Sequence, residues 1–348
     1  MHTRAEMIKA IRQEVMSRQN YLPSVEIDTL YLGGGTPSLL THRELDEVLE
    51  AVYCIYPLAK NAEITLECNP EDVSPKIASQ WLRLGINRIS LGVQSLNDAL
   101  LSAMGRLHNA NKAKQATFTL AEVGFENLSI DLIFGINGLS NDAWRNTLEE
   151  VVRWPIQHIS CYDLTIEGRN LWSHFSHRGR RFTASEEESA EQFRIAHHLL
   201  EANGFDHYEI SNYGRPGFES RHNQLYWKGY PYMGAGPSAH SYDGQRRRHN
   251  IANNYGYIQA IFHGRPYFVE EVLTANDRFN EWLLTRLRVR SGLSRTELAT
   301  FPKEYAAHLI YRIERWIETG HIQASDHGWH FSLEGMLLAD CIISDLMV

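Results

Sequence analysis

Five short segments rich in isoleucine, leucine and valine alternate with helical patterns along the first half of the chain. Apolar residues recur at helical spacing between these segments, over residues 41–55, 75–84, 110–123 and 141–153. The steps between segments are roughly 25–40 residues, as a parallel strand–helix–strand crossover requires. The pattern predicts an α/β fold with a parallel sheet and helices outside it. The expected strands are Ile27–Leu32, Glu63–Cys68, Arg88–Val93, Leu128–Phe134 and His158–Thr165.

A helix is expected at the start of the chain, with no strand before it. Residues 5–19 carry Met7, Ile8, Ile11 and Val15 at helical spacing. The whole chain has 348 residues, which is enough for a large core and one or two further parts.

Composition excludes several classes of protein. The hydrophobic share is 43% and the charged share 22%, which are ordinary values for a globular protein in water. The sequence contains no run of eighteen apolar residues, so no transmembrane helix is expected. The polar start lacks the apolar core of a signal peptide. The four cysteines are scattered without a Cys-x-x-Cys pair, which favours a reducing cytoplasm. We therefore expect a cytoplasmic protein.

Polar residues stand where each expected strand ends. They are Gly33–Thr36, Glu67–Pro70, Gly92–Ser95 and Asp163–Thr165, and the fourth expected strand contains Asp131. Because ligands bind beyond the C-terminal ends of parallel strands, we expect these residues to line one shared site at that edge of the sheet. The ordinary polarity of loops is the alternative explanation. Glu67 and Gln94 lie next to buried positions, however, where an unpaired polar group is costly, and this favours a shared site.

Three consecutive glycines, Gly33–Gly35, leave bare backbone at the end of the first expected strand. Backbone N–H groups at such a place favour an anionic or carboxylate group. No Lys-Ser/Thr follows the glycines, so the segment is not a P-loop, and the Gly-x-Gly-x-x-Gly spacing is also absent. A tight turn remains the alternative, because glycine clusters are common in loops.

A second informative stretch is His222–Trp227, followed by residues 228–240. Large flat side chains on an irregular backbone suit a flat ligand, and a histidine at the edge of such a patch can ligate haem iron. The alternative is a packed loop in which His222 holds the backbone. Arg246–Arg248 either meet ligand carboxylates by forked hydrogen bonds or form a solvated charge run. The aromatic residues and glycines of the stretch are Tyr226, Trp227, Tyr230, Tyr232, Gly229, Gly234 and Gly236.

The part between these two stretches is less informative. The polar residues 170–181 include His174 and His177, whose His-x-x-His spacing can ligate a metal on a helix, although a solvated loop is the alternative. Ser185–Glu188 is a capping box that opens a helix. Phe205–Asn212 is expected to be a strand.

From about residue 270 a compact helical part is expected. Phe279–Val289, a helix capped at Ser294–Glu297, and Tyr305–Thr319 precede a small hairpin over residues 321–333. This order resembles a winged-helix unit, which suggests DNA binding. Residues 270–348 hold 8 Lys/Arg and 12 Asp/Glu, a net charge of −4, whereas a DNA binder neutralises phosphates. We expect a packing or lid domain and no nucleic-acid partner.

Seven motifs in register resemble those of the oxygen-independent coproporphyrinogen III oxidase-like radical SAM proteins. The His-Asn-x-x-Tyr-Trp motif favours the HemW branch, whose members are haem chaperones, over the oxidase branch. The motifs are Gly-Gly-Gly-Thr-Pro-Ser at 33–38, Glu67-x-Asn-Pro70, Arg88-x-Ser-Leu-Gly-Val-Gln-Ser95, Asp131-Leu-Ile-x-Gly135, Tyr208-Glu-Ile-Ser-Asn212, Arg221-His-Asn-x-x-Tyr-Trp227 and Gly234-x-Gly-Pro-x-Ala-His-Ser241.

The resemblance implies a fold and a set of site residues. The family fold is a partial barrel of six βα units with a C-terminal helical domain, so this chain would lack the first strand. The implied divisions are a barrel over 1–170, a barrel extension over 171–269 and a C-terminal domain over 270–348. His222 would be the haem-ligand candidate. The residues implied for S-adenosylmethionine are Gly34, Gly35 and Thr36 at its methionine end, and Glu67, Gln94, Arg106, Asp131 and Thr165 along its remaining surface.

One departure from the family pattern concerns the [4Fe-4S] cluster. The family binds this cluster through Cys-x-x-x-Cys-x-x-Cys between its first strand and first helix, and this sequence has no such motif. Either the first strand and its cysteine loop are lost from a misassigned or shortened start, which we favour, or this is a cluster-less paralogue. The sequence as given should be catalytically inactive.

The resemblance leaves two functions open. The first is a haem-binding chaperone that delivers haem to an acceptor protein. The second is an enzyme, the coproporphyrinogen III oxidase that decarboxylates two propionates of its porphyrinogen substrate. The cofactors implied by the family are S-adenosylmethionine, the [4Fe-4S] cluster and haem.

Overall fold

The computed structural model describes residues 4–23, 26–165 and 182–348. They form two compact units. The sheet unit comprises the described parts of residues 32–39 and 64–220, and the composite unit those of residues 1–31, 40–63 and 221–348. The predicted metal pair His174 and His177, and the predicted domain boundary at residue 170, lie outside the described residues.

The main sheet has seven strands in the order β1-β2-β3-β4-β5-β7-β6. Strands β2 to β5 pair in parallel, and β7 pairs antiparallel with both β5 and β6. The parallel order confirms the strand–helix alternation predicted from the sequence. The strands are β1 (Ile27–Leu32), β2 (Leu58–Cys68), β3 (Arg88–Gln94), β4 (Asn127–Phe134), β5 (His158–Asp163), β6 (Asp206–Glu209) and β7 (Asn212–Gly214).

The prediction of one strand over Phe205–Asn212 is wrong, because the chain turns at Ile210 and Ser211 and forms the β6–β7 hairpin. The Glu209 carboxylate is buried at this turn and accepts hydrogen bonds from the Ser211 N–H and the Asn212 side chain. These bonds satisfy polar groups that a continuous strand would direct to a neighbouring strand.

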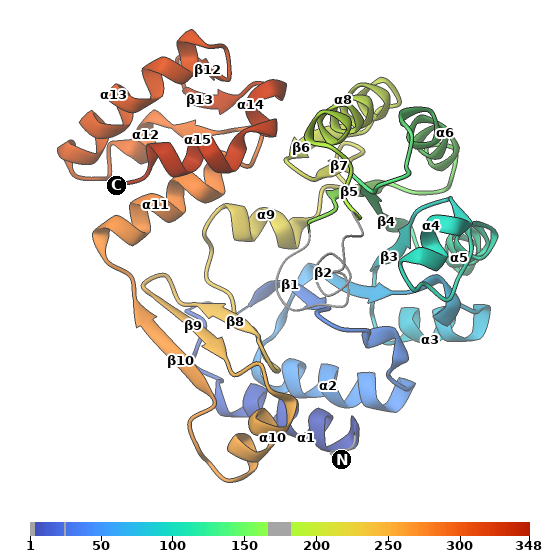
Figure 1. Ribbon diagram of the computed structural model, residues 1–348. Helices are drawn as coiled ribbons and strands as arrows, with labels where there is room; N and C mark the ends of the chain where they lie inside the picture. Colours follow the sequence, from blue (N-terminus) through green and yellow to red (C-terminus); the bar gives the residue numbers. More distant parts are fainter. Residues whose placement is uncertain (1–3, 24–25, 166–181) are drawn as a thin grey trace. The chain divides into compact units, whose positions relative to one another are not determined.

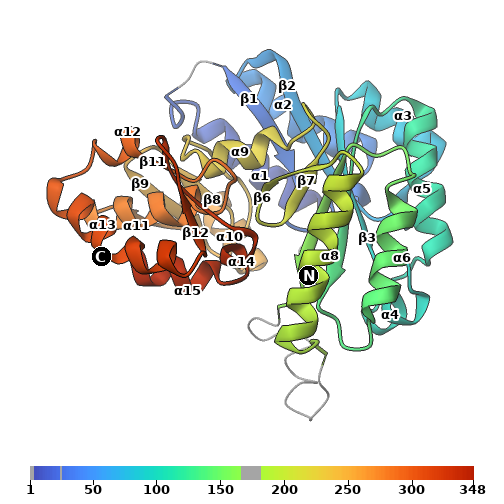
Figure 2. The same cartoon turned by 90° about the horizontal axis from the view of Figure 1, so that it is seen from above.

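Helices cover one face of the parallel strands in the sheet unit (Figure 1 and Figure 2). Ser74, Asn109 and Ser140 accept backbone N–H groups at the starts of three of these helices, as good N-cap residues do. The capping box predicted at Ser185–Glu188 is present. The helices are α3 (Pro75–Arg83), α4 (Asp98–Ala103), α5 (Ala110–Val123), α6 (Asn141–Val151) and α8 (Glu186–Ala202), with short 3-10 turns η1 (Pro37–Leu39) and η2 (Pro70–Asp72).

The covered face of the sheet is apolar. Side chains alternate along a strand, so that every second residue of β2, β3, β4 and β5 points toward the helices. Burying an aliphatic side chain of this size contributes about 1.5–3 kcal/mol. This face therefore forms the core of the sheet unit, and it leaves the opposite face to the polar residues of the same strands. The residues that form it include Leu66, Ile89, Leu91, Leu128, Ile130, Leu132 and Ile159, each at most 1% exposed.

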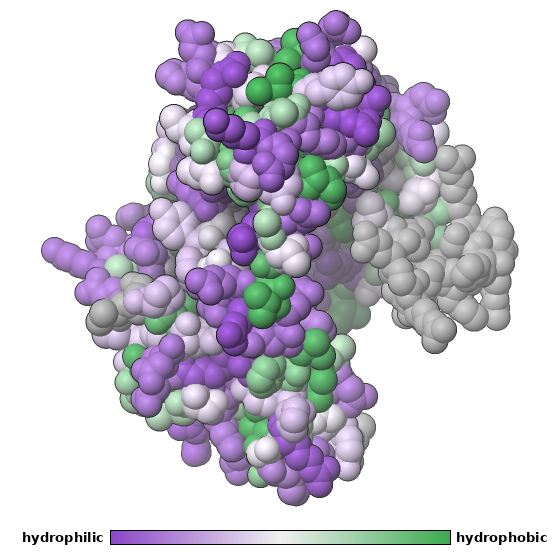
Figure 3. All heavy atoms as spheres, turned by 90° about the vertical axis from the view of Figure 1, so that its left-hand side faces the viewer, coloured by the Kyte–Doolittle hydropathy of each residue, from purple (hydrophilic) through white to green (hydrophobic). Residues whose placement is uncertain are grey.

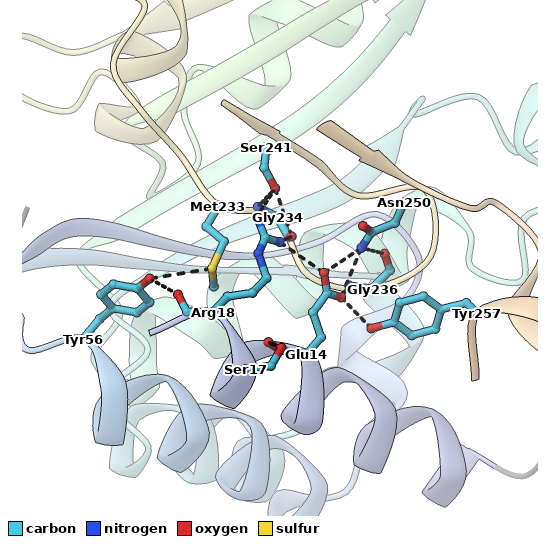
Figure 4. Close-up of polar contacts among 10 residues, drawn as sticks. All are labelled: Glu14, Ser17, Arg18, Tyr56, Met233, Gly234, Gly236, Ser241, Asn250 and Tyr257. Carbon is cyan, nitrogen blue, oxygen red and sulfur yellow. Dashed lines mark hydrogen bonds and ion pairs between the residues drawn. The ribbon is translucent and has the colours of Figure 1, made fainter. Parts of the chain in front are cut away.

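In the composite unit, the first helix packs against two others. A fully buried glutamate, Glu14, anchors this packing (Figure 4). Its carboxylate accepts hydrogen bonds from the Gly236 N–H at 2.9 Å, the Asn250 amide at 2.8 Å and the Tyr257 hydroxyl at 2.6 Å. Arg18 pairs with Glu14 at 3.1 Å. The three helices are α1 (Arg4–Ser17), α2 (His42–Ile55) and α10 (Asn254–Phe262).

Arg18 holds the glycine-rich motif that follows the His222 helix. It donates to the Gly234 carbonyl at 2.8 Å and to the Ser241 hydroxyl at 2.9 Å (Figure 4). The motif therefore folds as one piece with α1, although more than two hundred residues separate them. Nearby lie helix α9 (Arg221–Trp227) and a three-stranded antiparallel sheet in the order β10-β9-β8, formed by β8 (His240–Tyr242), β9 (Arg246–Asn250) and β10 (Phe268–Val272).

The last part of the composite unit has the helices and hairpin predicted from the sequence (Figure 2). A further strand, β11, joins the hairpin to give a three-stranded sheet in the order β11-β13-β12. Two helices that were not predicted close the chain. The elements are α11 (Ala275–Arg286), β11 (Leu293–Ser294), α12 (Arg295–Leu298), α13 (Lys303–Glu318), β12 (Ile322–Ala324), β13 (Gly328–Phe331), α14 (Leu333–Leu337) and α15 (Ala339–Leu346).

Hydrophilic residues predominate on the face shown in Figure 3, and the apolar ones form small groups between them. Scattered apolar residues of this kind are usual on a protein surface in water.

Candidate functional site

The uncovered face of strands β2 to β5 carries polar side chains. Register places Glu67 of β2 beside Ser90 of β3, and Asp131 of β4 beside Ser160 of β5. The two serines are buried, and the two acids are partly buried. Groups of this kind need partners or a ligand when they leave water. The structure therefore brings together two of the predicted site residues, Glu67 and Asp131, on one face.

Asp131 has an unusual environment for a carboxylate. The Ser90 hydroxyl lies 3.1 and 3.2 Å from its two oxygens. Burial raises the pKa of Asp131 to about 6, the nearby Glu67 carboxylate raises it further, and hydrogen bonds from Ser160 and Ser90 oppose the rise. Because it titrates near neutral pH, Asp131 changes charge within the range where proteins work.

The glycine segment lies against the end of β2. The Gly34 N–H donates to the Glu67 carboxylate at 3.1 Å. Gly34 has φ +73°, a conformation that glycine adopts without strain, and a Cβ atom on Gly34 or Gly35 would meet open space. The backbone is therefore both turned and accessible, so the segment forms a turn, and its role in ligand binding stays a prediction. Thr36 accepts the Leu39 N–H at the η1 turn.

Gln94 ends β3 in a strained conformation. Its φ of 65° is rare for a residue other than glycine, and its side chain is buried. The amide folds back over Gly92, where a Cβ atom would lie 2.8 Å from Gln94 Nε2 and 3.5 Å from Asn69 Oδ1. Strain of this kind concentrates at functional sites, where the surrounding structure holds it in place.

Arg106 joins the same group from the segment after α4. Its guanidinium donates to Asn69 Oδ1 at 3.2 Å. Partial burial lowers the pKa of Arg106, while Glu71 and Asp131 raise it, which shows that the cation lies within electrostatic reach of both acids. Thr165 lies two residues beyond β5 and is exposed.

A second group of polar residues lies on this face, and it was not predicted from the sequence. His158 Nδ1 lies 2.7 Å from the Ser129 hydroxyl, and Nε2 lies 2.8 Å from the Tyr208 hydroxyl. Burial, aided by the Arg88 cation, lowers the pKa of His158 well below its usual value, so the ring is neutral at pH 7. The signal that could have found this group is the period-two alternation of polar residues in β3, β4 and β5.

His222, the haem-ligand candidate, belongs to the composite unit and is the second residue of helix α9. The Glu63 carboxylate, itself buried, accepts the His222 N–H at 3.0 Å and the Arg221 N–H at 3.2 Å. The ring Nδ1 lies 2.8 Å from the Thr29 hydroxyl of β1. Tyr31 stacks on the ring at 4.9 Å between centroids. The backbone of His222 is thus held by β2, and one ring nitrogen and one ring face are held by β1.

Aromatic side chains continue from His222 through the composite unit. Tyr226 meets the His222 ring edge-on at 4.9 Å, Tyr232 lies 4.3 Å from Tyr226, and Tyr242 lies 6.3 Å from Tyr232. Tyr226 is 38% exposed and Tyr230 is 54% exposed, so part of this group is open to a ligand. A flat apolar ligand is the chemistry that such a group suits.

The three arginines of β9 have partners within the composite unit. Arg246 pairs with Glu270 at 3.0 Å and Arg247 with Glu281, and Arg248 lies over the Phe268 ring, 3.1 Å from its centroid. These contacts give the run a structural role, and they do not support its alternative role in binding ligand carboxylates.

Comparison with known proteins places this geometry in a family. A family model described as the radical SAM superfamily matches residues 11–151. The heme chaperone HemW of Synechocystis sp. is 34% identical over 90% of this chain and 77% of its own length. HemW of Escherichia coli is 30% identical over 93% of this chain and 85% of its own length. HemW of Bacillus subtilis is 29% identical over 96% of this chain and 89% of its own length. This chain belongs to the HemW family of radical SAM proteins.

The fold of this HemW-family chain agrees with a solved structure. The coproporphyrinogen III oxidase HemN from Escherichia coli superposes with a TM-score of 0.83, covering 100% of this chain and 85% of that one, at 18% identity. The predicted partial βα barrel of radical SAM type is thereby confirmed, and at this identity the likeness concerns the fold alone. Among the described residues, no helix is long and apolar enough to cross a membrane.

The cysteines described here do not fit an iron–sulfur cluster. Cys68 and Cys161 are buried, Cys54 and Cys341 are exposed, and the described residues contain no group of three or more His, Cys, Asp or Glu placed to hold a metal. Burial and four nearby acids raise the pKa of Cys68 well above its usual value, so it is a poor source of thiolate. The family's cluster thus has no ligand set among these residues.

Proposed function

We propose that this protein is a haem chaperone that binds haem through His222 and passes it to an acceptor protein. The single observation that carries the proposal is the way in which Thr29, Glu63 and Tyr31 hold the His222 ring and backbone. Histidines that bind metals are usually oriented by hydrogen bonds of this kind to their second ring nitrogen. The names of the HemW relatives point to the same ligand.

The exposed tyrosines beside His222 support a flat ligand rather than a bare metal ion. Haem has two apolar faces, and aromatic side chains provide a matching surface. Among the described residues there is no cluster of metal-binding side chains, so nothing here competes as a site for free metal. We infer a cytoplasmic location, which the scattered cysteines support because they form no disulfide framework.

We further propose that S-adenosylmethionine binds on the polar face of the sheet unit. This cofactor combines a cationic sulfonium and ammonium with an anionic carboxylate. The Glu67 and Asp131 carboxylates suit the cationic groups, and Arg106 and the accessible backbone of Gly34 and Gly35 suit the carboxylate. Thr36, Gln94 and Thr165 complete the proposed set.

Calorimetric titration with S-adenosylmethionine tests the second site. Glu67→Gln removes one charge-assisted contact, and we expect the affinity to fall about ten-fold or more. Glu126→Gln, at an exposed position of the same unit, is the control and should bind as the wild type does. Equal affinity in all three proteins would argue against Glu67 as a ligand.

When bound, S-adenosylmethionine and a cluster supply radical chemistry in this family. The described cysteines do not form a cluster site, so we derive no radical step for these residues, and the alternative function as a coproporphyrinogen III oxidase gains no support from them.

Haem titration followed by Soret absorbance tests the chaperone proposal. We expect a saturable Soret shift in the wild type and its loss in His222→Ala, because the proposed axial ligand is gone. His263→Ala is the matched control, since His263 is exposed and belongs to the same unit. Its titration should match that of the wild type.

Two results would contradict the chaperone proposal. Equal binding by the wild type and His222→Ala would return His222 to a structural role. An equal loss of binding in His222→Ala and His263→Ala would show that haem attaches to surface histidines without a defined site.

A further inference from the structure

We propose that Arg286 is a positioning residue that ties the helix of His222 to the last part of the composite unit. Arg286 is the last residue of helix α11, and its guanidinium joins the final carbonyls of α9 to a carboxylate of α12. The inference rests on the proposed haem-binding function and deepens it, because it makes the order of α9, and with it the haem affinity, depend on a residue outside that helix.

The guanidinium of Arg286 presents its donors to two different elements. Its Nη1 and Nη2 groups donate to the carbonyls of Trp227 and Lys228, and the bond to Lys228 is 3.0 Å long. Its Nε and Nη2 groups donate to the Glu297 carboxylate at 3.0 and 3.2 Å. The side chain of Arg286 is 17% exposed. A planar guanidinium with five N–H donors can make both sets of bonds at once, and a lysine ammonium cannot reproduce this fork.

The carboxylate that orients Arg286 is itself held in place. Glu297 accepts the Trp282 indole N–H at 2.8 Å, and Trp282 is buried within α11. Glu297 belongs to α12, where the Ser294 hydroxyl accepts its backbone N–H at the start of the helix. Arg286 therefore reaches α9 in a direction that two other helices set.

Helix α9 is held at both ends. The Glu63 carboxylate accepts the Arg221 and His222 N–H groups at its start. Arg286 lies at its end, where free carbonyls carry partial negative charge and favour a cation. A helix of seven residues is marginal on its own, so its order depends on such contacts. Because His222 and Tyr226 lie four residues apart with their rings 4.9 Å apart, contacts that order α9 order both side chains.

Hydrogen exchange of the haem-free protein, followed by mass spectrometry, tests this positioning role directly. The reporter is a peptide over residues 221–230, in which the Lys228, Gly229 and Tyr230 N–H groups donate to carbonyls of α9 at 2.9 to 3.0 Å. In Arg286→Ala these amides should exchange about ten-fold faster than in the wild type, because charged hydrogen bonds that hold the helix end are lost.

Arg288→Ala is the matched control. Arg288 also pairs with a single carboxylate, that of Asp340, but this partner lies in α15 and not in α9. Its loss should leave the exchange of residues 221–230 unchanged. Arg286→Lys keeps the charge but loses the fork, and its peptide should exchange nearly as fast as that of Arg286→Ala.

Haem titration of the same variants tests the consequence for binding. Arg286→Ala and Arg286→Lys should weaken haem binding about ten-fold, because the ligand must then order α9 when it binds. Arg288→Ala should bind as the wild type does. Circular dichroism of each variant confirms that it is folded under the conditions of the titration.

The outcomes separate the inference from the function on which it rests. If residues 221–230 exchange alike in Arg286→Ala and Arg288→Ala, the positioning role is wrong whatever the haem titration shows. If His222→Ala loses haem but Arg286→Ala binds normally, the inference is wrong and the chaperone proposal stands. If His222→Ala binds haem as the wild type does, the haem site at His222 is wrong, and the inference fails with it.

Discussion

At the scale of single residues, the surroundings decide which polar groups acquire an unusual pKa or conformation. Glu67, Asp131 and Gln94 are ordinary residue types that the sheet places where water is scarce. Asp131 titrates near pH 6 because it is buried beside another carboxylate, and Gln94 adopts a left-handed backbone that its type rarely takes. The same reasoning explains His222, whose ring is defined by neighbours from other elements.

The raised pKa of Asp131 predicts a pH dependence of stability. A carboxyl whose folded pKa lies above its unfolded value contributes stability that is present at low pH and is lost as pH rises through about 6. The loss amounts to at most about 3 kcal/mol, and less in practice because Asp131 keeps some contact with water. Asp131→Asn should therefore flatten the stability profile between about pH 4 and pH 7.

Urea denaturation of Asp131→Asn at a series of pH values measures this effect. Glu126→Gln, at an exposed position, is the control and should follow the wild-type profile. A difference between wild type and Asp131→Asn that stays constant across the range would show that Asp131 titrates elsewhere.

At the scale of elements, one helix organises a distant part of the chain. Glu14 of helix α1 pairs with Arg18, which directly follows the helix, and the motif Gly234–Ser241 folds onto that pair. The same motif leads into β8, and α10 contributes Tyr257 to the cluster. Three elements that are remote in sequence thus share one set of buried hydrogen bonds.

Removing Arg18 should strongly destabilise the protein. Arg18→Ala leaves the Glu14 carboxylate buried without its cation and removes the bonds to Gly234 and Ser241. We expect a loss of about 3–5 kcal/mol in the free energy of unfolding. Arg43→Ala is the control, because Arg43 also pairs with a glutamate four residues away but is 89% exposed, and it should cost at most about 0.5 kcal/mol.

Urea denaturation of the two arginine variants gives both values. Equal, small effects would show that the Glu14 cluster is satisfied by its neutral hydrogen bonds without Arg18.

At the scale of the whole chain, net charge opposes one class of partner, and the comparisons show the family. The net charge of −8, and of −4 over residues 270–348, opposes binding to nucleic acid even though the last elements resemble a winged helix. The HemW relatives cover most of the chain, and the HemN fold covers all of it. The two compact units carry different candidate sites, with the S-adenosylmethionine residues in the sheet unit and His222 in the composite unit.

The sequence alone determined the parallel sheet, its helices and most of the candidate residues. Apolar periodicity is a local property, and the capping box at Ser185 is read from four residues. Polar residues at strand ends were sufficient to indicate a shared face. Family motifs supplied Arg106, which lies outside any strand end.

Only the tertiary structure decided how these residues are paired. Thr29 and His222 are 193 positions apart, and Glu14 and Tyr257 are 243 apart, so neither contact has a local signal in the chain. The hairpin at Ile210 and Ser211 likewise depends on a buried carboxylate that periodicity does not reveal. Burial sets the pKa of Asp131 and neighbours orient the His222 ring, and both are properties of packing, which exists only when the chain is folded.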